Sequence, residues 1–171
     1  TTGIYFAQIN ANQHDAAQLE IHELAGQQRV RQMLVEEKLA PPPSLPPMLF
    51  TSTGNTDLAS ANRDWGKLDF DFAQRVLQLF SRMEKRGYPL ALLEGYRSAE
   101  RQDILASRGN HITRVSGNQS KHQFGLAVDV APLHDGRLII QNQDEWANEA
   151  YRTLGQEAEL LDRLALKRHK I

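Results

Sequence analysis

The 171-residue chain contains no cysteine. Disulfide frameworks, thiolate-bound zinc and cysteine nucleophiles are therefore excluded, and a metal ion would have to be held by His, Asp or Glu side chains. Excess charge is also absent, because the net charge is -1 with His neutral. No global field then favours nucleic acid or an anionic membrane surface, and we expect neither as a partner. No run of about 18 apolar residues occurs, so we expect no membrane-spanning helix.

The composition is that of a soluble globular protein, with 40% hydrophobic and 24% charged residues. The length suits one domain of ordinary size with additional chain. The first residues, Thr1–Ile4, lack the basic region followed by an apolar region that marks a secretory signal. The sequence therefore leaves the export route unknown.

The N-terminal part is expected to form a unit distinct from the rest. Apolar residues recur at helical spacing between residues 14 and 39 and predict a helix. Residues 41–47 contain five prolines, which excludes a helix or a central strand and predicts a stiff extended linker. We therefore divide the chain into residues 1–47, a helix with a proline-rich linker, and residues 48–171.

The second unit has an α+β pattern, which predicts a small antiparallel sheet flanked by helices. Asp69 or Asp71 is expected near the start of its first helix, Gly87 after the end of that helix, and Ser98 as the N-cap of the next. The expected elements are a helix over 67–86, a buried strand over 89–94, a helix over 98–107, a strand over 125–130, a turn over 134–137, a strand over 138–140 and a helix over 144–166.

Two residue types that bind metals lie seven positions apart near the strand expected over 125–130. His122 lies in a loop rich in Gly, Asn, Ser and Gln, whereas Asp129 interrupts an apolar strand. A carboxylate in such a strand is costly to bury unless it is paired or bound to a cation. The ordinary interpretation is a polar loop residue and a salt-bridge partner. The alternative is a catalytic zinc site with nitrogen and oxygen ligands.

The string from Ser120 to Asp129, Ser-x-His-x-x-Gly-x-Ala-x-Asp, favours the zinc site. It resembles the metal-binding motif of the zinc D,D-peptidases, which include D-Ala-D-Ala carboxypeptidases and phage L-alanoyl-D-glutamate endolysins. The resemblance implies a D,D-peptidase-like fold in which His122 and Asp129 are ligands of Zn²⁺. It also implies that Ser120 contacts the substrate.

A second string resembles the same family. Glu94-Gly-Tyr-Arg-Ser followed by Gln102 is similar to the Gly-Tyr-Arg-Ser-x-x-x-Gln element that joins a strand to a helix. The resemblance implies that Arg97 is catalytic, polarising the scissile carbonyl and stabilising the oxyanion. It places Gln102 at the substrate site. Alone, Arg97 would be interpreted as an ion-pair partner of Glu94 or Glu100.

The end of the family motif is missing from residues 161–171. The family has a Trp-Gly-Gly strand there, followed by a general-base carboxylate and a third ligand His. This sequence instead has His169 between basic residues. His169 is the candidate third zinc ligand, and Glu157, Glu159 and Asp162 are candidate acids by elimination only. We therefore expect residues 48–171 to form a zinc peptidase domain that is incomplete at its C-terminal end.

The resulting functional hypothesis is a zinc metallopeptidase that cleaves peptidoglycan stem peptides near a D-amino acid, as a carboxypeptidase or an endopeptidase. Its expected place of action is the periplasm or the cell wall. One alternative is a module of the same fold that binds peptidoglycan without cleaving it. Another keeps the enzyme but has residues 1–47 dock it onto a delivery machine, as an endolysin or an injected effector.

Overall fold

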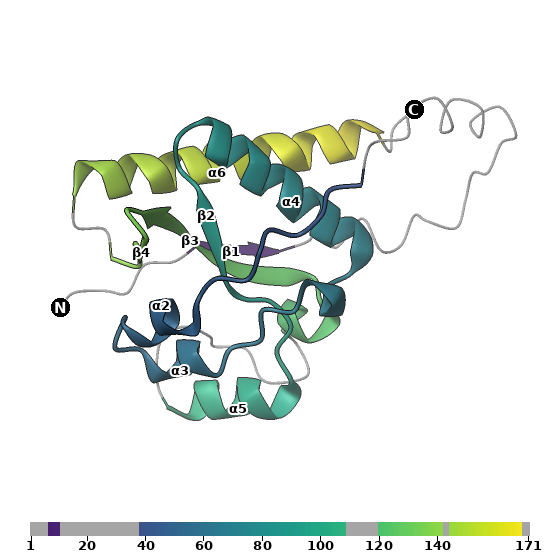
Figure 1. Cartoon of the computed structure of the whole chain (residues 1–171). Helices are drawn as coiled ribbons and strands as arrows, with labels where there is room; N and C mark the ends of the chain where they lie inside the picture. Colours follow the sequence, from purple (N-terminus) through teal and green to yellow (C-terminus); the bar gives the residue numbers. More distant parts are fainter. Residues whose placement is uncertain (1–6, 11–37, 109–119, 142–143, 169–171) are drawn as a thin grey trace, which may run out of the picture.

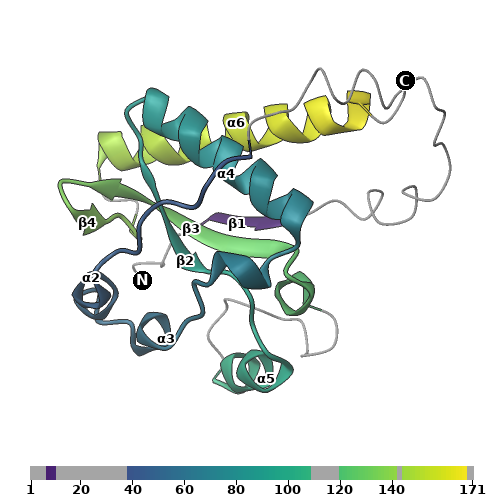
Figure 2. The ribbon, with the colours of Figure 1, turned by 45° about the vertical axis from the view of Figure 1, so that its right-hand side comes forward.

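The computed structural model describes residues 7–10, 38–108, 120–141 and 144–168. Within these residues, β1 (Ala7–Asn10), β3 (Ala127–His134) and β2 (Leu90–Glu94) form an antiparallel sheet in the order β1-β3-β2. A fourth strand, β4 (Arg137–Leu138), pairs with the end of β3. The central strand is therefore β3, as Figures 1 and 2 show, and Asp129 lies on it.

Two long helices cover one face of the sheet. These are α4 (Phe70–Lys85) and α6 (Glu145–Arg168), which lie above the sheet in Figures 1 and 2. Side chains of β3 alternate between the two faces, so Val128 and Val130 point toward this helical layer. The main core lies here and combines Leu68, Phe72, Ala73, Val76, Leu79, Met83, Leu90, Leu92, Val128, Val130 and Leu154.

Three shorter helices lie on the opposite side of the sheet. They are α2 (Pro47–Thr51), α3 (Thr56–Ala59) and α5 (Ala99–Ser107), below the sheet in Figure 1. A smaller core of Phe50, Leu93, Ala131 and Ile140 packs on this side. Because Asp129 alternates with Val128 and Val130, its side chain also faces this smaller layer. The expected α+β class, a small antiparallel sheet flanked by helices, is confirmed.

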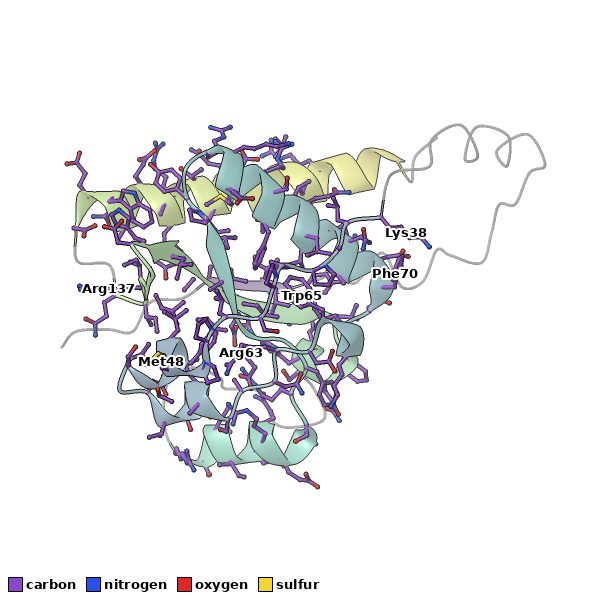
Figure 3. The ribbon with its side chains drawn as sticks, viewed as in Figure 1. Lys38, Met48, Arg63, Trp65, Phe70 and Arg137 are labelled. Carbon is purple, nitrogen blue, oxygen red and sulfur yellow. The ribbon has the colours of Figure 1, made fainter. Side chains whose placement is uncertain are left out.

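The proline-rich segment packs on the second unit. Gln74 on α4 bonds both the backbone N–H and the carbonyl of Leu39, at 2.9 and 3.0 Å. Lys38 lies over the ring of Phe70 at the start of α4, where Figure 3 labels both residues. Leu45 contacts the smaller core. These contacts fix the entry of the chain into α2, while the division at residue 47 stays a prediction.

Several expected boundaries are shifted by local chemistry. The helix expected over 67–86 is α4, and it starts at Phe70. The Asp69 side chain accepts a hydrogen bond from Phe72 N and caps this helix. The three residues before Leu68, Trp65–Lys67, form a separate 3₁₀ turn, η2. Ser98 caps α5 as expected, and Gly87 follows α4 with φ of +84°.

The strand expected over 125–130 starts later and ends later, at Ala127 and His134. Asp135 and Gly136 then have φ of +49° and +70° and form the expected turn. The next strand covers Arg137–Leu138 instead of 138–140. The helix expected over 14–39 falls mostly outside the described residues. No described helix combines the length and the hydropathy that crossing a membrane requires.

Candidate metal centre

Asp129 occupies the middle of the sheet. Its backbone is paired with Gln8 of β1 on one side and with Glu94 of β2 on the other. The register between β2 and β3 shifts between Leu92 and Glu94, so β2 carries a bulge beside Asp129. Such bulges redirect side chains locally. Asp129 is only 4% exposed, so its carboxylate requires partners.

His122 is held by a short 3₁₀ helix, η4 (Lys121–Phe124), that leads into β3. The helix ends at Gly125, which has φ of +67°. A Cβ atom at this position would lie 2.6 Å from the carbonyl oxygen of Lys67 and 2.8 Å from the backbone nitrogen of Asp69. Asp69 N donates to the Gly125 carbonyl at 3.0 Å. Only glycine therefore lets the chain turn from η4 into β3 against the start of α4.

The imidazole of His122 is fully buried and has a defined tautomer. Its Nδ1 lies 2.7 Å from the carbonyl oxygen of Gly95. A carbonyl only accepts hydrogen bonds, so Nδ1 carries the proton and donates it. The backbone is also tied here, because Arg97 N donates to the His122 carbonyl at 3.2 Å. A backbone carbonyl on one ring nitrogen is the usual arrangement for a histidine that binds a metal through the other.

The unprotonated Nε2 of His122 lies near Asp129. The distance from Nε2 to Asp129 Oδ1 is 3.5 Å, and Oδ1 is buried without a hydrogen-bond partner. Two ligand atoms on one tetrahedral zinc, at about 2.0–2.1 Å each, lie about 3.3–3.4 Å apart. Two electron-rich atoms at this separation, one of them an unsatisfied carboxylate oxygen, fit a shared cation. The structure brings these two side chains together, while their role as zinc ligands stays a prediction.

The other carboxylate oxygen of Asp129 is held by a buried ion-pair network. Arg97 Nη2 lies 2.9 Å from Asp129 Oδ2 and 2.5 Å from Glu94 Oε2. Arg97 Nη1 donates to Gln102 Oε1 at 2.8 Å, and Arg101 Nε donates to Glu94 Oε1 at 2.5 Å. Two acids and two arginines thus balance each other, and all of them except Arg101 are buried. The network aims Asp129 Oδ1 at His122.

Arg97 and Gln102 belong to the network that holds Asp129, and Ser120 lies two residues before His122. Arg97 is 2% exposed, and its N–H groups donate to Glu94, Asp129 and Gln102. The ordinary interpretation of Arg97 anticipated the ion pair with Glu94. Gln102 is fully buried below Arg97. Ser120 precedes η4 and is 8% exposed. Their roles on the carbonyl and the substrate stay predictions.

The candidate third ligand, His169, lies outside the described residues. Within the described parts of the chain, no cluster of three or more His, Asp or Glu side chains is arranged to hold a metal ion. Glu157 is a poor candidate acid, because its carboxylate binds Arg82 and Arg86 of α4 in the helical layer, on the other side of the sheet from Asp129. His134 stacks on Trp146 at the far end of β3.

The sequence prediction missed Gln8 and treated Glu94 only as a possible ion-pair partner of Arg97. Glu94 closes the apolar strand β2 and is 4% exposed, so the argument used for Asp129 applies to it equally. Gln8 lies on β1, and its Nε2 is 2.6 Å from His122 Nε2. A four-residue strand of Ala, Gln, Ile and Asn has no distinctive sequence signal. Its partner is 114 residues away along the chain.

A pocket of about 30 Å³ opens on the Arg97 side of Asp129. Its lining combines the charged network with apolar residues of α3, α5 and β2, namely Leu58, Leu93 and Leu105. A volume of this size holds about two water molecules.

Comparison with known proteins places these motifs in a family. Residues 66–162, more than half of the chain, match the model of VanY, D-alanyl-D-alanine carboxypeptidase. The chain is also similar to the peptidoglycan L-alanyl-D-glutamate endopeptidase CwlK of Bacillus subtilis (strain 168), with 37% identity over 60 residues. That match covers 32% of this chain and 36% of the relative, so the chain spans about a third of the curated protein that it matches. From the length of the family match and the paired His122 and Asp129, we conclude that the chain belongs to the D-alanyl-D-alanine carboxypeptidase family.

Proposed function

We propose that this protein is a zinc-dependent peptidase that cleaves peptidoglycan stem peptides next to a D-amino acid residue. The observation that carries the proposal is the pair formed by His122 Nε2 and the unsatisfied Asp129 Oδ1, 3.5 Å apart. Membership of the family and the similarity to an enzyme named for an L-alanyl-D-glutamate bond support the substrate class. Both carboxypeptidase and endopeptidase cleavage are compatible with this support.

Residues around the pair would prepare the site for a metal ion. The Gly95 carbonyl fixes the tautomer of His122, and Arg97 orients Asp129. When bound, zinc supplies a Lewis acid that polarises a carbonyl and lowers the pKa of a water molecule. The buried network around Arg97 keeps the surroundings of the pair electrically balanced before any metal binds. A third ligand and a general base would complete the site, and His169 is the candidate for the third ligand that the sequence offers.

The first experiment measures the zinc content of the purified chain by mass spectrometry. About one zinc per chain is expected for the wild type, with loss of zinc in His122→Ala and in the near-isosteric Asp129→Asn. His134→Ala is the matched control, because His134 is partly exposed and stacks on Trp146 away from the site. Circular dichroism of each variant separates loss of the metal from loss of the fold.

The second experiment digests purified peptidoglycan with the zinc-loaded chain and identifies the products by mass spectrometry. Release of peptides cut beside a D-residue, abolished by a chelator and restored by zinc, is the expected result. Zinc in neither the wild type nor the variants, together with unchanged peptidoglycan, would overturn the proposal. Binding of muropeptides without cleavage would then identify a binding module of the same fold.

The place of action proposed with this function is the periplasm or the cell wall, where the substrate is. We also propose that residues 1–47 connect the domain to a delivery machine or another partner protein. The contacts of Leu39 with Gln74, and of Leu45 with the smaller core, support a segment that leaves the domain in a fixed direction. Capture of a partner by the full chain, but not by a chain that lacks residues 11–37 and keeps β1, would test this.

A further inference from the structure

The edge strand β1 places a polar side chain directly over the paired ligands. Gln8 lies opposite Asp129 in the antiparallel register, and directly opposite residues project to the same face of a sheet. Its neighbour Ile9 packs into the main core on the other face. The residue Gln8 is exposed, whereas His122 and Asp129 are buried. Gln8 therefore stands between the paired ligands and solvent.

The contact of Gln8 with His122 uses the lone pair that a metal would use. The amide Nε2 of Gln8 is 2.6 Å from His122 Nε2. Since His122 Nδ1 already donates to Gly95, the Gln8 amide is the donor in this hydrogen bond and Nε2 is the acceptor. A half-turn of the amide exchanges its nitrogen for its oxygen. The same side chain can thus present either a donor to the imidazole or an oxygen to a cation.

We propose that Gln8 supplies the third protein ligand, through Oε1, of the metal held by His122 and Asp129. This inference rests on the proposed function and names a residue outside both sequence strings that resemble the family. The geometry carries it, because Gln8 already reaches one of the two ligand atoms and is paired with the residue that carries the other. Among the described residues, no third His, Asp or Glu joins the pair.

The charges agree with a neutral third ligand. The two acids of the site, Glu94 and Asp129, are already balanced by Arg97 and Arg101. A divalent ion bound by neutral His122, Asp129 and a neutral amide keeps most of its positive charge. A site of this kind is a strong Lewis acid and binds its metal less tightly than one with an additional anionic ligand.

The competing explanation is that Gln8 only occupies the lone pair and must leave before a metal binds. The two explanations predict opposite signs for one variant. Gln8→Ala removes a ligand in our proposal and lowers the affinity for zinc. If Gln8 is only an obstacle, the same variant removes a competing hydrogen bond and raises the affinity.

The test measures zinc affinity of the full 171-residue chain by competition with a chromogenic chelator. We expect Gln8→Ala to weaken zinc binding about tenfold or more, and Gln8→Glu, which has the same length and adds a charge, to strengthen it. Gln156→Ala is the matched control, because Gln156 is exposed on α6. Cobalt(II) spectra of the same chains report the ligand set, and Gln8→Ala is expected to change the visible bands.

Each other outcome contradicts the proposal. Unchanged or tighter zinc binding by Gln8→Ala, with His122→Ala still abolishing it, would show that Gln8 is not a ligand and would leave the proposed function intact. Absence of zinc binding in the wild type would overturn the proposed function first. Thermal unfolding of metal-free Gln8→Ala shows whether β1 remains paired, and Gln8→Glu keeps the test informative if the alanine variant loses stability.

Discussion

Replacing Arg97 by Met tests whether the ion-pair network holds Asp129 in place. Arg97 donates to Glu94, Asp129 and Gln102, and both acids are 4% exposed. Met fills a similar volume without charge. Glu94 keeps Arg101 at 2.5 Å, but the carboxylate of Asp129 loses its cationic partner. Removing one partner from a buried ion pair costs about 3–5 kcal/mol, because the remaining charge stays buried.

The expected loss is a large part of the about 5–15 kcal/mol that folding supplies in total. Urea unfolding, followed by far-UV circular dichroism in the presence of a chelator, measures it without a metal ion taking the place of the guanidinium. Arg152→Met is the control, because Arg152 forms an exposed pair with Glu149 on α6 and no measurable loss is expected.

A double variant tests whether the unpaired carboxylate of Asp129 causes the loss of stability in Arg97→Met. Asp129→Asn introduced into Arg97→Met removes that charge, so the double variant should be more stable than Arg97→Met alone by roughly 0.5–3 kcal/mol. Equal stability of the two, or a loss in Arg97→Met no greater than in Arg152→Met, would refute the reasoning. In that case Asp129 would not depend on Arg97 for its position.

Two further stability predictions follow from the packing. Gly125→Ala is expected to cost more than about 2 kcal/mol by chemical denaturation, since φ is +67° and the new Cβ would meet backbone atoms of Lys67 and Asp69. Gly136→Ala has a similar φ of +70° with open space around it, so equal losses would disprove the close approach. Glu157 has a pKa lowered below its ordinary value of 4.5, first by its hydrogen bond from Arg82. Its pairing therefore stabilises the fold above about pH 4.5 and is lost as the pH falls through the folded pKa, so the stability difference between wild type and Glu157→Gln should shrink in acid. A difference that is constant with pH would contradict this.

The elements that the sequence predicted well are those with local causes. The periodicity of the segment around α4 was sufficient to predict that helix, and Asp69 and Ser98 were recognisable caps. The prediction for Asp129 also had a local cause, because a carboxylate among apolar strand residues needs a partner nearby. The prediction that a strand starts at Gly125 was wrong because it also used local sequence alone. A glycine before an apolar run resembles the start of a strand, and only the approach of residues 67–69 shows that it ends η4.

The features that the sequence did not predict depend on contacts between distant segments. The strand β1 pairs with β3 across more than a hundred residues, and its four residues do not differ from an ordinary loop by composition. The function of Glu94 as the link between Arg97 and Arg101 also requires the fold, because a sequence does not show which arginines converge on one acid. The position of β1 and the role of Glu94 therefore both depend on contacts between segments that are distant in the sequence.

The two halves of the candidate metal site differ in how firmly they are held. His122 and Asp129 are oriented by Gly95 and Arg97, through contacts that involve the central strand and the segments next to it. The proposed third ligand comes from a four-residue strand at the edge of the sheet, where pairing is available to other chain segments. The identity of the third donor can therefore change without rebuilding the other two. We expect metal binding to be abolished by substitutions of His122 or Asp129 but only tuned by substitutions of Gln8.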